Sequence, residues 1–306
     1  MESLIRHAGE STEKGLAWIV DHLDLFVPED PFNPENMKAL AELSFLFGCL
    51  FEWRSGTADS KLDAIQCQLI DFLSKPCISE WVRKLPAYYS PYLVAYLPLR
   101  STGIRLPLME EATKALRRAG YPYGLEMTPY RELELQYLTW KAGISRRPPA
   151  WGTVYRRTTL ARCRNPIYFS LPEVYSVTHT LFYLTDFAGP AAIAPSDREL
   201  AISIVEPLAL HYWRKPDWDL TSELLLNLVA LDRFETPLFC AAFTALQQNW
   251  RPDGSLPGPA FGQLASDASR RDVFERCYHT TLVALLLCGG LLHRITERVD
   301  VLQVYA

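Results

Sequence analysis

The chain has 306 residues, of which 49% are hydrophobic and 12% aromatic, enough to bury a large core and unlike a disordered or fibrous composition. The net charge of −4 and the pI near 5.9 argue against nucleic acid or an anionic membrane as the main partner, because both favour a basic footprint. We therefore expect a small molecule as the partner, with no nucleic acid and no membrane. A homodimer is compatible with this composition.

The first residues of the chain lack the apolar segment and small-residue cleavage site of a signal peptide. The longest strongly apolar run, 282–292, is too short to span a bilayer and contains a Gly-Gly pair. These features predict a cytoplasmic protein. The seven cysteines are scattered and form no Cys-x-x-Cys motif, which is typical of reduced thiols used as small hydrophobes. A structural zinc site is not expected, while a metal bound by histidine and carboxylates stays open.

Apolar residues recur at helical spacing along most of the chain, and proline or glycine marks most of the boundaries. The segment 86–107 is rich in proline and tyrosine and predicts short helices and turns. Elsewhere the pattern predicts helices at 11–26, 34–53, 58–74, 108–119, 129–142, 172–187, 196–213, 220–232, 237–250 and 272–291, followed by a short tail segment.

Few windows alternate with period two, so strands should be rare and the fold should be all-α. Ten to twelve helices joined by short loops fit consecutive antiparallel helical hairpins. Aromatic and polar residues concentrate in the later helices, which favours closure into a single (α/α)6-type toroid over residues 1–306, with a central cavity. Three predicted helices end in the same dipeptide, Ala-Gly, with the glycines at Gly120, Gly143 and Gly189. Each glycine is expected to be a left-handed C-cap in a repeated helix-plus-loop unit.

A basic connector at about 144–171 separates the N-terminal and C-terminal halves. No acid occurs from Leu135 to Pro172. One interpretation is that this connector is a crossover that binds an anion, a phosphate or carboxylate. The other interpretation is a solvated linker, which is favoured because charge runs usually mark exposed segments. The cations of this stretch are Lys141, Arg146, Arg147, Arg156, Arg157, Arg162 and Arg164.

The predicted helix 172–187 carries an unusually polar and aromatic face. His179 and Asp186 are seven residues apart, so they should point the same way about 10 Å apart along the axis and act on a substrate between them. Tyr175, Phe182 and Tyr183 share that face. The alternative is a buried histidine bonded to a backbone carbonyl and an aspartate near a helix C-terminus, where a negative charge is unfavourable.

A second histidine, His279, lies in an apolar helical pattern next to Tyr278, with Glu275 four residues earlier. A lone histidine on such a face is usually a satisfied core residue. The neighbouring polar groups raise the alternative that His279 is functional.

Acidic residues open the helix predicted at 220–232. Asp219, Glu223 and Asn227 follow i, i+4, i+8 and should project near one another. Asp217 is expected to be the N-cap of this helix, since early acids suit its positive end. For Asp219, a cap and a functional role stay equally open.

Two segments resemble a known superfamily. The helix with Tyr278-His279-Thr280 resembles the segment of protein prenyltransferase β subunits that supplies their zinc-binding histidine. The turn Trp250-Arg251-Pro252-Asp253-Gly254-Ser255 resembles the Asp-Gly turns of that superfamily and of terpenoid cyclases. The resemblance implies an (α/α)6 toroid with the active site in its cavity.

On the same resemblance, His279 would be the zinc-type histidine. Asp217-Trp218-Asp219 would stand where the family has Asp-x-Cys, so that Asp219 replaces the thiolate. The segment around His179 is similar to bacterial proteins of specialised-metabolite pathways.

The first functional expectation is a small-molecule enzyme that uses acid/base groups and no cofactor for a cyclisation, elimination or isomerisation, as a lyase or isomerase. Its expected catalytic residues are His179, Asp186, Asp219 and His279. The expected lining of its substrate pocket is Tyr175, Phe182, Tyr183, Tyr278 and Glu223.

The second expectation is a transferase or hydrolase in which Asp217, Asp219 and His279, with His179 as a further candidate, bind zinc or another divalent metal. The third is a non-catalytic helical binding protein whose polar stripe recognises a partner.

Overall fold

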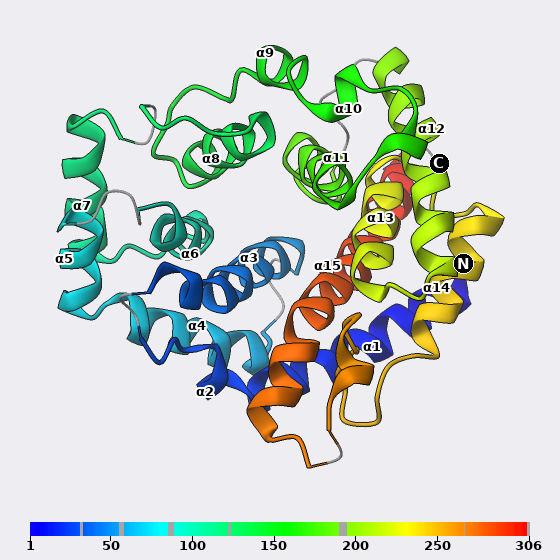
Figure 1. Ribbon diagram of the computed structural model, residues 1–306, viewed down its shortest axis with the longest axis horizontal. Helices are drawn as coiled ribbons and strands as arrows, with labels where there is room; N and C mark the ends of the chain where they lie inside the picture. Colours follow the sequence, from blue (N-terminus) through cyan, green and yellow to red (C-terminus); the bar gives the residue numbers. More distant parts are fainter. Residues whose placement is uncertain are drawn as a thin grey trace. The chain divides into compact units, whose positions relative to one another are not determined.

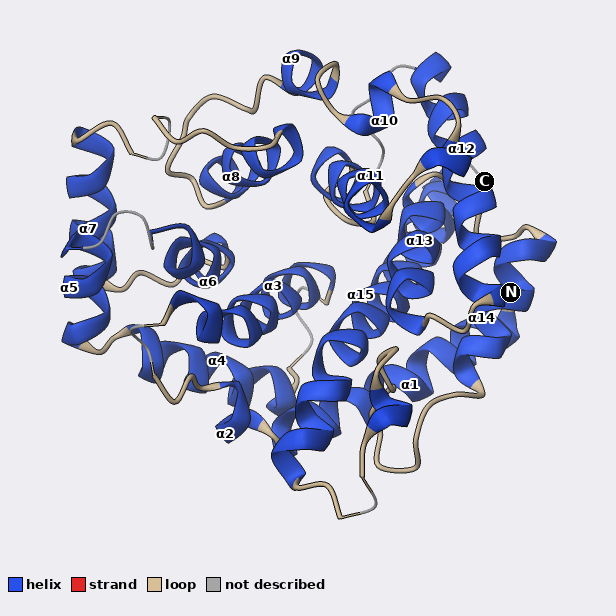
Figure 2. Ribbon diagram, in the orientation of Figure 1, coloured by secondary structure: helices blue, strands red, loops and turns tan. Residues whose placement is uncertain are grey.

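The computed structural model describes residues 1–30, 33–54, 58–84, 89–121, 124–189, 195–265 and 267–304. Across these ranges the regular secondary structure is helical and contains no strand, which confirms the all-α prediction (Figure 2). Two compact units are present: Met1–Trp18 with Ala150–Ala306 form unit 1, and Ile19–Pro149 form unit 2. One boundary falls inside the first helix, α1 (Glu2–Asp21), and the other inside the predicted connector.

Unit 2 is built around the pairing of two apolar helices, α3 and α6 (Figure 1). Gly48 of α3 faces Pro98 of α6, and a Cβ at Gly48 would lie 3.1 Å from the Pro98 Cβ. Pro98 lies inside a 13-residue helix, where the sequence predicted only short helices and turns. The helices of this unit are α2 (Leu23–Phe26), η1 (Pro34–Met37), α3 (Lys38–Trp53), α4 (Ser60–Leu73), α5 (Pro76–Lys84), α6 (Tyr89–Ser101), α7 (Pro107–Arg118) and α8 (Pro129–Lys141).

Unit 1 is organised around α13, which packs against α11, α12, α14 and α15 (Figure 1). Every residue of α13 from Asp219 to Ala230 is buried, as expected for a helix that has neighbours all round. Besides most of α1, the helices of this unit are α9 (Trp151–Tyr155), α10 (Thr159–Arg162), η3 (Pro166–Tyr168), α11 (Leu171–Leu184), α12 (Pro195–Arg214), α13 (Trp218–Ala230), α14 (Pro237–Gln247), η4 (Phe261–Gln263) and α15 (Arg270–Val304).

The expected left-handed glycine caps occur at two of the three sites. Gly120 has φ 88° and Gly143 has φ 68°, and each follows directly on a helix C-cap. The third prediction was wrong: α11 ends at Leu184, and Asp186 takes the left-handed position with φ 48°. Gly189 instead lies close to the backbone of Thr185: a Cβ at Gly189 would be 2.9 Å from the Thr185 carbonyl oxygen.

The final helix, α15, runs unbroken from Arg270 to Val304, although the sequence predicted an end near residue 291. A glycine in a helix costs about 1 kcal/mol relative to alanine. Packing of α15 against α13 outweighs this cost at the Gly-Gly pair. Within the described ranges, no helix combines the length and the apolar character that crossing a membrane requires.

Candidate functional site

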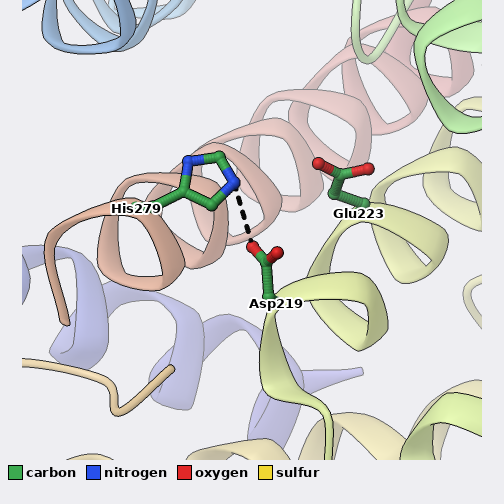
Figure 3. Close-up of side chains that lie close together, drawn as sticks. All are labelled: Asp219, Glu223 and His279. Carbon is green, nitrogen blue, oxygen red and sulfur yellow. Dashed lines mark ion pairs between the residues drawn. The ribbon is translucent and has the colours of Figure 1, made fainter. Parts of the chain in front are cut away.

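Three ionisable side chains meet where α13 packs against α15 (Figure 3). Asp219 and Glu223 lie one turn apart on α13, and His279 projects toward them from α15. One oxygen of each carboxylate and one nitrogen of the imidazole all lie within 4.8 Å of one another. Residues 60 positions apart in the chain are thus brought to one point.

Asp219 is held by one hydroxyl and one imidazole. Its Oδ2 accepts a hydrogen bond from the Tyr175 hydroxyl at 3.1 Å, and its Oδ1 lies 3.2 Å from His279 Nε2, the contact drawn in Figure 3. Oδ1 is buried and accepts no aligned hydrogen bond from the described residues. A buried carboxylate oxygen in this state has electron pairs available to a ligand.

Glu223 faces a second imidazole. Its Oε2 accepts a hydrogen bond from Thr178 Oγ1 at 2.5 Å and lies 3.8 Å from His179 Nδ1. The Thr178 hydroxyl also lies 3.1 Å from the same ring nitrogen. Tyr175 and Thr178, three residues apart on α11, therefore contact Asp219 and Glu223, four residues apart on α13.

The imidazoles and the carboxylates differ in their access to solvent. The side chains of His279 and His179 are 27% and 22% exposed, whereas those of Asp219 and Glu223 are 8% and 2% exposed. A ligand arriving from solvent would meet the imidazoles before the carboxylates.

Charge at the site affects two neighbouring groups. Burial and the nearby charges of Asp219 and Glu223 raise the pKa of Tyr175, which keeps its hydroxyl protonated as a donor. Burial, reinforced by the charge of Asp219, also raises the pKa of Asp217.

Asp217 is the N-cap of α13, as predicted, and accepts a hydrogen bond from the backbone N–H of Leu220 at 3.2 Å. Glu223, and not Asp217, completes the group with Asp219 and His279.

The prediction that His179 and Asp186 lie on one helical face was wrong. Asp186 lies beyond the end of α11, where the backbone turns left-handed and the N–H of Phe187 bonds back to the carbonyl of Phe182 at 2.9 Å. A short polar side chain tolerates this conformation, so the position of Asp186 has a structural explanation.

The predicted aromatic residues lie around His179 and beside His279. The rings of Tyr175, Phe182 and Tyr183 lie 5.9, 5.5 and 6.4 Å from the His179 ring, and Phe182 and Tyr183 are buried. Tyr278 stacks on Phe274 with ring centroids 5.0 Å apart. The aromatic groups thus border the two histidines.

A loop supports the turn of α15 that carries His279. The N–H of Gly258 donates to the carbonyl of Arg276 at 2.8 Å, and the N–H of Leu256 donates to Thr281 Oγ1 at 2.9 Å. A Cβ at Gly258 would lie 2.7 Å from that Arg276 oxygen. The loop therefore contacts α15 on both sides of His279, at the Arg276 carbonyl before it and at the Thr281 hydroxyl after it.

Sequence reasoning missed Thr178, the hydroxyl donor to Glu223. The available signal was spacing: polar residues at i, i+3 on one helix and i, i+4 on another fit two helices packed side by side.

Asn227, one turn beyond Glu223 on α13, is fully buried, and its side-chain atoms have no hydrogen-bond partner among the described residues.

Comparison with known proteins gives a single family. Residues 12–289 match the family described as "Domain of unknown function (DUF6895)", so the match covers most of the chain. No curated protein and no solved structure matches the chain.

Proposed function

Because the chain belongs to this family, whose description names no activity, we propose a function from the site itself: a small-molecule enzyme in which Asp219, Glu223 and His279 bind one divalent cation. The observation that carries this proposal is the meeting of two buried carboxylates and one imidazole within 4.8 Å.

Two buried carboxylates one turn apart need positive charge nearby. Burying an ionised carboxylate is costly unless it is paired or binds a metal, and two together repel each other as well. Asp219 forms no ion pair with lysine or arginine in the described part of the chain, and its Oδ1 has no aligned hydrogen bond. A divalent cation would supply positive charge to Asp219 and, through the same ion, to Glu223.

The three ligand atoms suit such an ion in number, chemistry and spacing. An ion centred among atoms 4.8 Å apart would lie about 2.8 Å from each, so shifts well under about 1 Å would give bonds of about 2.0–2.2 Å. One imidazole nitrogen with two carboxylate oxygens favours Zn²⁺ or Mn²⁺. Three protein ligands also leave a coordination position for the substrate.

The surrounding residues have distinct roles in this proposal. A bound divalent ion would act as a Lewis acid on a carbonyl or phosphoryl oxygen of the substrate. Tyr175 and Thr178 hold Asp219 and Glu223 in orientation through their hydroxyl hydrogen bonds. His179, beside Glu223 and partly exposed to solvent, is placed to exchange a proton with the substrate.

A second candidate function is the metal-free acid/base enzyme expected from the sequence, a lyase or isomerase that performs a cyclisation, elimination or isomerisation. It is favoured by a specific feature: each buried carboxylate faces one imidazole, Asp219 with His279 and Glu223 with His179. The closure of the helices into an (α/α)6 toroid with a central cavity stays a prediction. The setting in cytoplasmic bacterial specialised metabolism also stays a prediction.

Metal analysis of the purified protein tests the proposal. We expect about one equivalent of zinc or manganese, which is lost in His279→Ala and retained in His293→Ala. The matched control is close: His293 lies on the same helix, is 25% exposed and contacts a carboxylate, Glu297, at 3.4 Å. A protein that binds neither ion and retains a chemical activity dependent on His279 would establish the metal-free enzyme instead.

A further inference from the structure

A second surface of unit 1, outside the candidate site, combines basic and apolar side chains. Arg156, Arg157, Arg162 and Arg164 are exposed on the chain around α10. Directly after them, Ile167 and Tyr168 of η3 are 78% and 80% exposed. We call these six residues the 156–168 surface and propose that it binds the anionic surface of a lipid bilayer.

The apolar pair is presented by an ordered turn. Asn165 caps η3, with its Oδ1 accepting a hydrogen bond from the backbone N–H of Ile167 at 3.1 Å, and the N–H of Phe169 closes the turn onto the carbonyl of Pro166 at 3.0 Å. The turn also packs against α12. Local hydrogen bonding therefore holds two large apolar side chains out in solvent.

The charge of this region departs from that of the whole chain. No acidic residue occurs from Leu135 to Pro172, so the net negative charge of −4 arises entirely elsewhere. Arg162 also lies against Arg156, because its Nε donates to the Arg156 carbonyl at 3.2 Å, which keeps the two arginines close. The expectation of no membrane partner followed from the net charge of the whole chain, and this proposal departs from it. The weak overall acidity does not oppose contact with an anionic surface through this one basic face.

The form of the surface favours a bilayer over a protein partner. Ile167 and Tyr168 project as neighbours from one turn, and a projecting apolar pair enters a soft headgroup layer without needing a matching pocket. Tyrosine is suited to this layer, with an apolar ring and a polar hydroxyl. The preceding arginines match the phosphates of anionic headgroups. This inference is independent of the proposed metal site.

Vesicle flotation with the full chain tests the proposal. We expect binding to vesicles of phosphatidylcholine mixed with phosphatidylglycerol, no binding to phosphatidylcholine alone, and release by salt. Arg162→Glu/Arg164→Glu and Ile167→Ser/Tyr168→Ser should each lower the affinity by at least tenfold, because they remove the charge and the insertion separately. All four side chains are exposed, so the fold should be retained, as circular dichroism would show.

Two matched controls change exposed residues elsewhere. Lys38→Glu/Lys114→Glu makes the same change in charge, and Leu108→Ser/Leu210→Ser removes two side chains that are 43% and 47% exposed. Both should bind vesicles as the unaltered chain does. Equal loss in a control, or no binding to anionic vesicles, would overturn the proposal. Binding to polyglutamate without binding to vesicles would overturn it in favour of an acidic protein partner.

Discussion

Replacing Glu223 by glutamine should make the metal-free protein more stable while abolishing its response to metal. Glu223 and Asp219 are both buried, and their ligand oxygens lie within 4.8 Å. Two like charges at that separation repel by about 3.5 kcal/mol at an effective dielectric of about 20. The substitution removes this repulsion, and the amide offers a donor to the neighbouring carboxylate.

The gain is offset by a weaker contact with Thr178. Its hydroxyl donates to Glu223 at 2.5 Å, and a hydrogen bond to an ionised group contributes about 1 kcal/mol more than one to a neutral group. The Glu223→Gln chain without metal should therefore be more stable by about 2.5 kcal/mol, which raises Tm by about 5–10 °C for a unit of this size. In the unaltered chain, metal at a hundredfold excess over Kd adds about 2.7 kcal/mol.

Thermal unfolding with chelator and with added Zn²⁺ or Mn²⁺ measures both effects. The matched control is Glu134→Gln, whose carboxylate is also buried, at 6% exposure, but is paired with Arg131 at 2.8 Å. That control should lose stability in both conditions and keep the full metal response. A Glu223→Gln chain that is less stable with chelator and still responds to metal would refute the reasoning.

Three further changes test other parts of the structure. The hydrogen bond from Arg100 lowers the pKa of Glu110 below its usual 4.5. This hydrogen bond contributes about 1 kcal/mol to the stability of the folded chain, fully above pH 4.5, and the contribution is lost as the pH falls through the lowered pKa. The stability difference between the unaltered chain and Glu110→Gln, measured by urea unfolding, should shrink on acidification; a difference that grows would contradict the assignment. Gly258→Ala should weaken metal affinity at least tenfold in titration calorimetry, because its Cβ would displace the turn that carries His279; unchanged affinity would show that the loop does not position it. Thr178→Val should lower metal affinity less than Glu223→Gln does, because it loosens a ligand without removing it, and an equal loss would argue that Thr178 itself binds the ion.

The helices with local start and stop signals were predicted closely. The predicted helix at 129–142 is α8 (Pro129–Lys141), with proline at its start and Gly143 left-handed after its end. The N-cap at Asp217 was predicted for the same reason, since a cap depends on residues within one turn. The end of α11 was misjudged because Asp186 reads as a helical residue by spacing, whereas its backbone is left-handed.

The sequence by itself determined the all-α class, most helix positions and the polar character of Asp219, Glu223 and His279, because periodicity and capping are local properties. Only the tertiary structure decided which polar residues share a site. Packing of α13 against α11 and α15 sets that choice, and it selected Glu223 over Asp217 and joined Thr178 to it. Contacts between residues 44 to 60 positions apart depend on how whole helices pack, and local spacing suggests such contacts without selecting the pairs.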